Sequence, residues 1–100
     1  MPVYMVDRNL PGITKEQLVG AQKKAIETCR TFTAKGTPVR YIRSMFLPEE
    51  AHCMCLFEAS TADTVRQVNE TAQLPFTRIT PAEDLTPAAE KFTAGTGRLA

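Results

Sequence analysis

The sequence predicts an α+β domain in which strands and helices follow one another in the order β-α-β-β-α-β. Short apolar runs alternate with two segments whose apolar residues recur every three or four positions. Two of the apolar runs are separated only by Pro48-Glu49-Glu50, which predicts a hairpin between them. With 100 residues and 43% hydrophobic content, the chain is long enough for one domain with its own core.

The first strand and the first helix have clear sequence signals. Residues 2–8 form a short and mostly apolar run, which favours a central strand covered on both faces. Thr14 and Gln17 have the spacing of a capping box, so the helix is expected to begin at Thr14, and Gly36 is expected to end it. The apolar face of this helix consists of Leu18, Ala21, Ala25, Cys29 and Phe32.

The hairpin strands are expected over 38–47 and 52–59. The second of these strands is apolar on both faces, so it too is expected in the centre of the sheet. Alternation in the first of them places Tyr41, Arg43 and Met45 on one face.

The turn length suggests a register for this hairpin. It places Arg40 opposite Glu58, which is a favourable cross-strand charge pair, and Arg43 opposite Cys55. Arg43 would then stand on an otherwise apolar strand face. Because a buried guanidinium must be paired, Arg43 either contacts a ligand or reaches solvent from an edge strand.

The second half of the chain completes the pattern. Ser60 is expected to cap the second helix, and a fourth strand is expected over 76–80. The inner face of this helix is expected to comprise Thr61, Val65, Val68 and Ala72. The domain would thus cover 1–85, leaving 86–100 as a partly flexible C-terminal extension with a helical turn over 87–92.

This element order is the ferredoxin-like arrangement, with an antiparallel sheet and both helices on one face. The other face would carry several apolar side chains. Since an uncovered apolar face of that size is unfavourable in water, we expect a homodimer that packs sheet against sheet and closes a dimeric α/β barrel.

Composition excludes some partners and locations. A net charge of +1, without a basic and aromatic surface pattern, argues against nucleic acid. No apolar run is long enough to cross a membrane and the N-terminus lacks signal-peptide features, so a cytoplasmic location is expected. Three cysteines are an odd number, which favours reduced thiols over a disulfide framework.

Three segments of the chain are similar to a known family. They are Met1-Pro2-x-Tyr4-x-Val6-x-Arg8, Cys55-Leu56-Phe57-Glu58-Ala59 and Val65-Arg66-x-x-Asn69-x-x-Ala72-x-Leu74-Pro75-Phe76-x-Arg78. In these segments the chain resembles a bacterial family of small proteins of unknown function, whose described member is a nickel-binding homodimer with a ferredoxin-like fold. The resemblance implies that fold, a homodimer, and a Ni²⁺ role in storage, sequestration or sensing. It implies no particular set of ligands.

The candidate metal ligands are His52 and Glu50, which are neighbours at the hairpin tip. Nickel favours imidazole nitrogen together with carboxylate oxygen. His52 is the chain's one histidine, so a second protomer or water would have to complete such a site. Alternatively, His52 is an ordinary residue at a strand end. Cys53 and Cys55 lie on the other face of the strand and fit best as small core residues.

A small enzyme is an alternative hypothesis. After removal of Met1, Pro2 would carry a secondary amine, and the opening strand and helix resemble tautomerase-superfamily proteins, in which such a proline acts as a base. Arg8, Arg40 or Arg43 could then bind a substrate carboxylate.

A third hypothesis is a small-molecule site between sheet and helices or within a dimeric barrel. Its candidate residues are Tyr4, Tyr41, Arg43, Cys55 and Glu58, although strand alternation prevents all five from facing one pocket.

Overall fold

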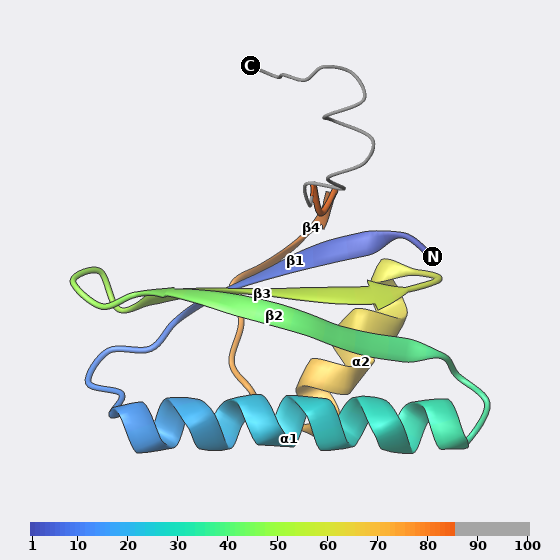
Figure 1. The fold of residues 1–100 in the computed structure, drawn as a ribbon, viewed down its shortest axis with the longest axis horizontal. Coiled ribbons are helices and arrows are strands. Elements are labelled where there is room, and N and C mark those ends of the chain that lie inside the picture. The colour runs from blue at the N-terminus through green and yellow to red at the C-terminus, as the bar shows by residue number, and fades with distance from the viewer. Residues whose placement is uncertain (86–100) are drawn as a thin grey trace, which may run out of the picture.

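The computed structural model describes residues 1–85 and confirms the predicted α+β fold. Its elements are β1 (Val3–Asn9), α1 (Lys15–Ala34), β2 (Val39–Leu47), β3 (His52–Ala59), α2 (Ala62–Thr71) and β4 (Arg78–Ala82). The strands form one antiparallel sheet in the order β2-β3-β1-β4, so β1 and β3 are central as predicted. Both helices lie on the same side of the sheet (Figure 1). The predicted extension at 86–100 and its helical turn lie outside the described residues.

Helix α1 begins and ends where its sequence signals indicate. The Thr14 hydroxyl accepts a hydrogen bond from the Gln17 backbone N–H at 3.1 Å, and the Gln17 side chain accepts one from the Thr14 backbone N–H at 3.0 Å. Gly36 follows the helix with a φ of 101°, which glycine adopts without steric cost. Ala25 and Cys29 are buried against the sheet, as the apolar face predicted.

Two boundaries differ from the prediction in the second half. Thr61, not Ser60, is the N-cap of α2; its backbone is extended and its hydroxyl accepts from the Thr64 N–H at 3.2 Å. Strand β4 covers Arg78–Ala82 instead of 76–80. The residues before it are needed to bring the chain from the helix layer to the sheet edge, and only at Thr77 does a backbone N–H reach β1.

The hairpin register is correct in its first part. Arg40 lies opposite Glu58 as predicted, and its Nε donates to Glu58 Oε1 at 3.0 Å.

Beyond this pair the predicted register is wrong, because the ladder shifts between Tyr41 and Arg43 and leaves Ile42 as an extra residue. Such a bulge moves every later residue to the opposite face. Arg43 therefore lies opposite Leu56 instead of Cys55, and it shares no face with Tyr41.

The core lies between the sheet and the two helices. Phe57 of β3 and Val6 of β1 are fully buried, and Val65 and Val68 of α2 pack over them. The rings of Phe57 and Tyr41 meet edge to face, with centroids 5.6 Å apart. No helix within residues 1–85 is long and apolar enough to span a membrane.

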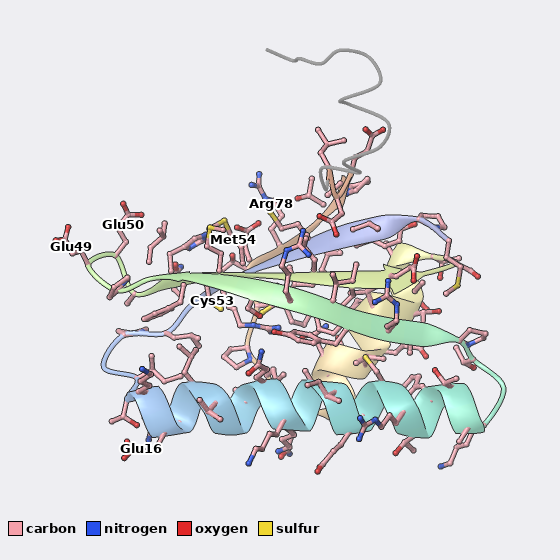
Figure 2. The ribbon with its side chains drawn as sticks, viewed as in Figure 1. Glu16, Glu49, Glu50, Cys53, Met54 and Arg78 are labelled. Carbon is pink, nitrogen blue, oxygen red and sulfur yellow. The ribbon has the colours of Figure 1, made fainter. Side chains whose placement is uncertain are left out.

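The other side of the sheet is here called the open face. Figure 2 shows Met54 and Arg78 on this side, whereas Cys53 points toward α1. The alternation of β1 and β3 also places Met5, Asp7, His52, Leu56 and Glu58 on it. Met45 is 62% exposed there, so part of the open face is apolar and accessible.

Candidate functional site

A histidine and an aspartate form a hydrogen-bonded pair on the open face. Asp7 lies in central strand β1 and is only 5% exposed. His52 begins β3, opposite Asn9. Its Nε2 lies 2.9 Å from Asp7 Oδ1, and its Nδ1 lies 3.1 Å from Asn9 Oδ1. The strand pairing alone thus brings three polar side chains together.

The geometry selects one tautomer of the neutral His52 ring. A carboxylate only accepts hydrogen bonds, so the ring proton lies on Nε2 and is donated to Asp7. Nδ1 then keeps its lone pair and faces Asn9 Oδ1, which is also an acceptor, so in this tautomer the two atoms are neighbouring lone-pair donors and not a hydrogen-bonded pair. The second oxygen of Asp7, Oδ2, is buried without a hydrogen-bond partner in the described chain, and Arg78 Nε lies 3.6 Å from it.

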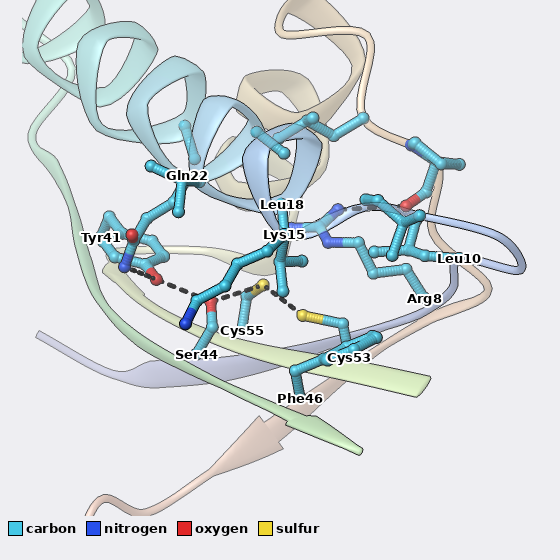
Figure 3. A pocket seen from close by; sticks show the side chains of 16 residues that line it. Arg8, Leu10, Lys15, Leu18, Gln22, Tyr41, Ser44, Phe46, Cys53 and Cys55 are labelled. Atoms are coloured by element: carbon cyan, nitrogen blue, oxygen red, sulfur yellow. Dashed lines mark hydrogen bonds between the residues drawn. The ribbon is translucent and has the colours of Figure 1, made fainter. Parts of the chain in front are cut away.

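The opposite side of the sheet holds a cavity of about 380 Å³, here called the α1 cavity. It lies between the first half of α1 and strands β1, β2 and β3 (Figure 3). Its walls are mainly apolar, formed by Leu10, Ile13, Leu18, Val19, Ala21, Ala25, Phe46, Leu74 and Pro75. Its polar lining comes from Arg8, Lys15, Gln22, Tyr41 and Ser44, and from two thiols.

A chain of hydrogen bonds ends at one of these thiols. Gln22 Nε2 donates to the Tyr41 hydroxyl at 3.0 Å, which lies 2.6 Å from Ser44 Oγ. Ser44 Oγ in turn donates to Cys55 Sγ at 2.9 Å. Cys53 Sγ lies 3.7 Å from Cys55 Sγ on the other side. Figure 3 shows this series along the sheet side of the cavity.

The same contacts separate the acidities of the thiols. The hydrogen bond from Cys53, followed by the positive charge of Arg8 and the Ser44 hydroxyl, lowers the pKa of Cys55. That shared proton and burial raise the pKa of Cys53. Burial raises the pKa of Cys29, on the buried face of α1, to about 11. Cys55 is therefore the thiol that ionises first.

The family model described as "Nickel responsive protein SCO4226-like" matches residues 4–81. The chain belongs to this family. The crystal structure of SCO4226 from Streptomyces coelicolor A3(2) matches with a TM-score of 0.69 and 22% sequence identity, covering 84% of this chain and 99% of that one. That similarity supports the ferredoxin-like fold. No curated protein matches the sequence.

In this member of the SCO4226-like family, the two predicted metal ligands, His52 and Glu50, do not contact each other through a hydrogen bond or ion pair within residues 1–85. His52 donates to Asp7, and its other ring nitrogen lies beside Asn9 Oδ1. Glu50 is exposed in the β2–β3 turn and projects to the open-face side (Figure 2).

The five predicted pocket residues are divided between the two faces. Tyr41 and Cys55 line the α1 cavity and are connected through Ser44. Tyr4 packs against the core. Arg43 lies on the open face and forms an ion pair with Asp84.

Glu58 also lies on the open face, beside Arg40, and contributes to a second cavity at the other end of α1 and β2. Pro2, the candidate amine, is exposed, and its carbonyl accepts from the Ala59 N–H at 3.1 Å. Pro2 lines neither the α1 cavity nor the second cavity.

Sequence reasoning missed several residues of these sites. Asp7 and Asn9 join His52 through the pairing of β1 with β3, which are more than forty positions apart in sequence. Ser44 reaches Cys55 only because of the bulge at Ile42. The polar run Asp7-Arg8-Asn9, which ends the otherwise apolar first strand, was the available sequence signal for polar side chains here, and strand alternation places positions 7 and 9 on the same face.

Proposed function

We propose that this protein binds Ni²⁺ as its cargo, for storage, sequestration or sensing, and that His52 on the open face is a ligand. The family description, nickel responsive, supports this class of metal. The observation that carries the proposal is the contact between His52 and the buried carboxylate of Asp7.

A carboxylate behind a histidine is the arrangement that orients metal-binding imidazoles. Such a histidine donates one ring N–H to the carboxylate and presents its other nitrogen to the metal. Here Asp7 fixes Nε2, which leaves Nδ1 of His52 and Oδ1 of Asn9 side by side at 3.1 Å. Imidazole nitrogen with carbonyl and carboxylate oxygen suits Ni²⁺, so the donor set fits the ion.

Asp7 offers a further oxygen that could coordinate a metal ion beside His52. Its Oδ2 is buried and lacks a hydrogen-bond partner among residues 1–85. The neighbouring Arg78 side chain is 68% exposed, so it can move to solvent when a cation approaches. A buried oxygen without a partner is costly, and coordination of an ion would relieve that cost.

One chain supplies only part of a coordination sphere. Within residues 1–85 no three His, Cys, Asp or Glu side chains cluster in a way that could hold a metal. We therefore infer that a second copy, water or both complete the site, and that the copies meet through their open faces. Exposed Met45 beside Met54 gives this face an apolar patch, and Glu50 at its edge is the proposed carboxylate ligand.

Calorimetric titration with NiCl₂ tests this proposal on the full chain. The intact protein should bind, and His52→Ala should abolish binding because it removes the chain's one imidazole. Glu50→Gln should weaken binding, whereas its neighbour Glu49→Gln serves as the matched control in the same turn. Absence of binding by the intact protein, or equal affinity in His52→Ala, would refute the proposal.

Asp7→Asn tests the orienting carboxylate. An amide keeps the size of the side chain but loses the charge that holds the His52 proton. Removing such a partner typically lowers metal affinity about 10- to 100-fold. Asp63→Asn, on the exposed surface of α2, is the matched control and should leave affinity unchanged.

A further inference from the structure

The α1 cavity has an unbalanced charge. Of the sixteen residues that line it, Arg8 and Lys15 are basic, and none is Asp or Glu. The site of the proposed nickel binding lies on the opposite face of the sheet, so this cavity is separate from it. A mostly apolar cavity with only positive charges is electrostatically suited to an anion.

Arg8 is the more unusual of the two cations. It is 3% exposed, and its Nη1 donates to the Pro75 carbonyl at 3.1 Å. No carboxylate in the described residues pairs with it, although a guanidinium has five N–H donors. Buried arginines are rare unless they are paired, since the loss of hydration must be compensated.

Part of that compensation comes from sulfur. The positive charge of Arg8 favours the thiolate of Cys55, which also receives hydrogen bonds from Ser44 and Cys53. Lys15 remains as a second cation at the cavity, and it is exposed to solvent. Two basic side chains outnumber this one thiol, so the lining stays net positive even when Cys55 is ionised, and Arg8 still has N–H groups without a carboxylate partner among residues 1–85.

We propose that the α1 cavity binds a small monocarboxylate with a compact apolar body, and that Arg8 holds the carboxylate. A guanidinium and a carboxylate form two parallel hydrogen bonds, which an inner, poorly hydrated position strengthens. The apolar body would lie against Leu18, Ala21 and Phe46. The volume of about 380 Å³ is within the usual range of small-molecule pockets.

Other ligand classes fit the lining less well. A metal cation would be repelled by Arg8 and Lys15, even though two thiols are close together. A di- or trianionic phosphate would have to lose much of its hydration among apolar walls with little hydrogen-bonding capacity. A single carboxylate on an apolar body matches both the positive charge of Arg8 and Lys15 and the apolar side chains of the cavity wall.

Calorimetry with matched pairs of probes tests this inference. Octanoate and benzoate should bind the intact protein at least tenfold more tightly than the neutral octanamide and benzamide. Arg8→Gln should remove this preference, with a loss of roughly 10- to 100-fold for the carboxylates, because a hydrogen bond to a charged group is lost. Arg30→Gln removes an exposed arginine elsewhere on α1 and should leave the preference intact.

Ala21→Phe keeps the inference testable where Arg8→Gln fails to fold. This change fills the cavity from α1 while Arg8 stays in place, so a folded Ala21→Phe protein should lose octanoate binding. Equal affinities for octanoate and octanamide in the intact protein would overturn the inference. So would octanoate binding that persists undiminished in Ala21→Phe, or no binding of either carboxylate to the intact protein.

Discussion

Ser44→Ala should change the ionisation of Cys55 without emptying the core. Ser44 donates its hydroxyl to Cys55 Sγ at 2.9 Å, and its own oxygen lies 2.6 Å from the Tyr41 hydroxyl. A hydrogen bond to a charged group contributes about 1.5–3 kcal/mol. Since a change of one unit in pKa corresponds to about 1.4 kcal/mol, the loss of this hydrogen bond should raise the pKa of Cys55 by about one to two units.

Alkylation by iodoacetamide as a function of pH measures this change, with peptide mapping to assign the labelled thiol. Only the thiolate reacts, so in the intact protein Cys55 should be labelled before Cys29, whose pKa burial raises to about 11. In Ser44→Ala the rate profile should move to higher pH, while Ser60→Ala at the end of β3 should not move it. An unmoved profile in Ser44→Ala, or labelling of Cys29 at the same rate as Cys55, would refute this account of the thiols.

Three further outcomes are expected. The pKa of Cys55 is lower in the folded than in the unfolded chain, so its contribution to stability is complete above the unfolded value and is lost as the pH falls through the folded one. The free energy of unfolding, measured with urea, should therefore rise from about pH 6 toward pH 9, and Cys55→Ala should flatten that rise. Phe57→Ala should cost about 3–5 kcal/mol in the same assay, because Phe57 is fully buried; a loss below 1 kcal/mol would contradict the described core. Light scattering should give a dimer for the intact protein and a smaller species for Met45→Lys, whereas a monomeric intact protein would contradict pairing through the open face.

The sequence was a good guide wherever local chemistry determines the structure. The capping box of Thr14 and Gln17 and the burial of Ala25 and Cys29 follow from side chains close together in sequence. Strand β3 alternates as predicted over its whole length.

The sequence was a poor guide to the pairing of β2 with β3, where a single extra residue shifts the register. The bulge at Ile42 places Ser44 beside Cys55 and turns Arg43 to the open face, and nothing in the alternation of β2 signals it. Because side chains in a strand alternate between the two faces of the sheet, one extra residue in the pairing moves every later side chain to the face opposite the predicted one.

In the candidate sites, too, some residues could be predicted from the sequence and others depend on the tertiary fold. His52 could be selected from composition alone, because it is the only imidazole. Its partner Asp7 could not, because the pairing of β1 with β3 depends on the whole fold. The burial of Arg8 likewise depends on α1 and the segment at Pro75 covering the end of β1.

X-ray absorption spectroscopy of the protein loaded with Ni²⁺ tests the central claim most directly, because the protein offers two chemically distinct sets of donors on opposite faces of one sheet. Binding at His52 predicts a first shell of nitrogen and oxygen with the outer-shell scattering of imidazole. A first shell containing sulfur, from Cys53 or Cys55, or a nitrogen and oxygen shell without imidazole, would contradict the proposed site.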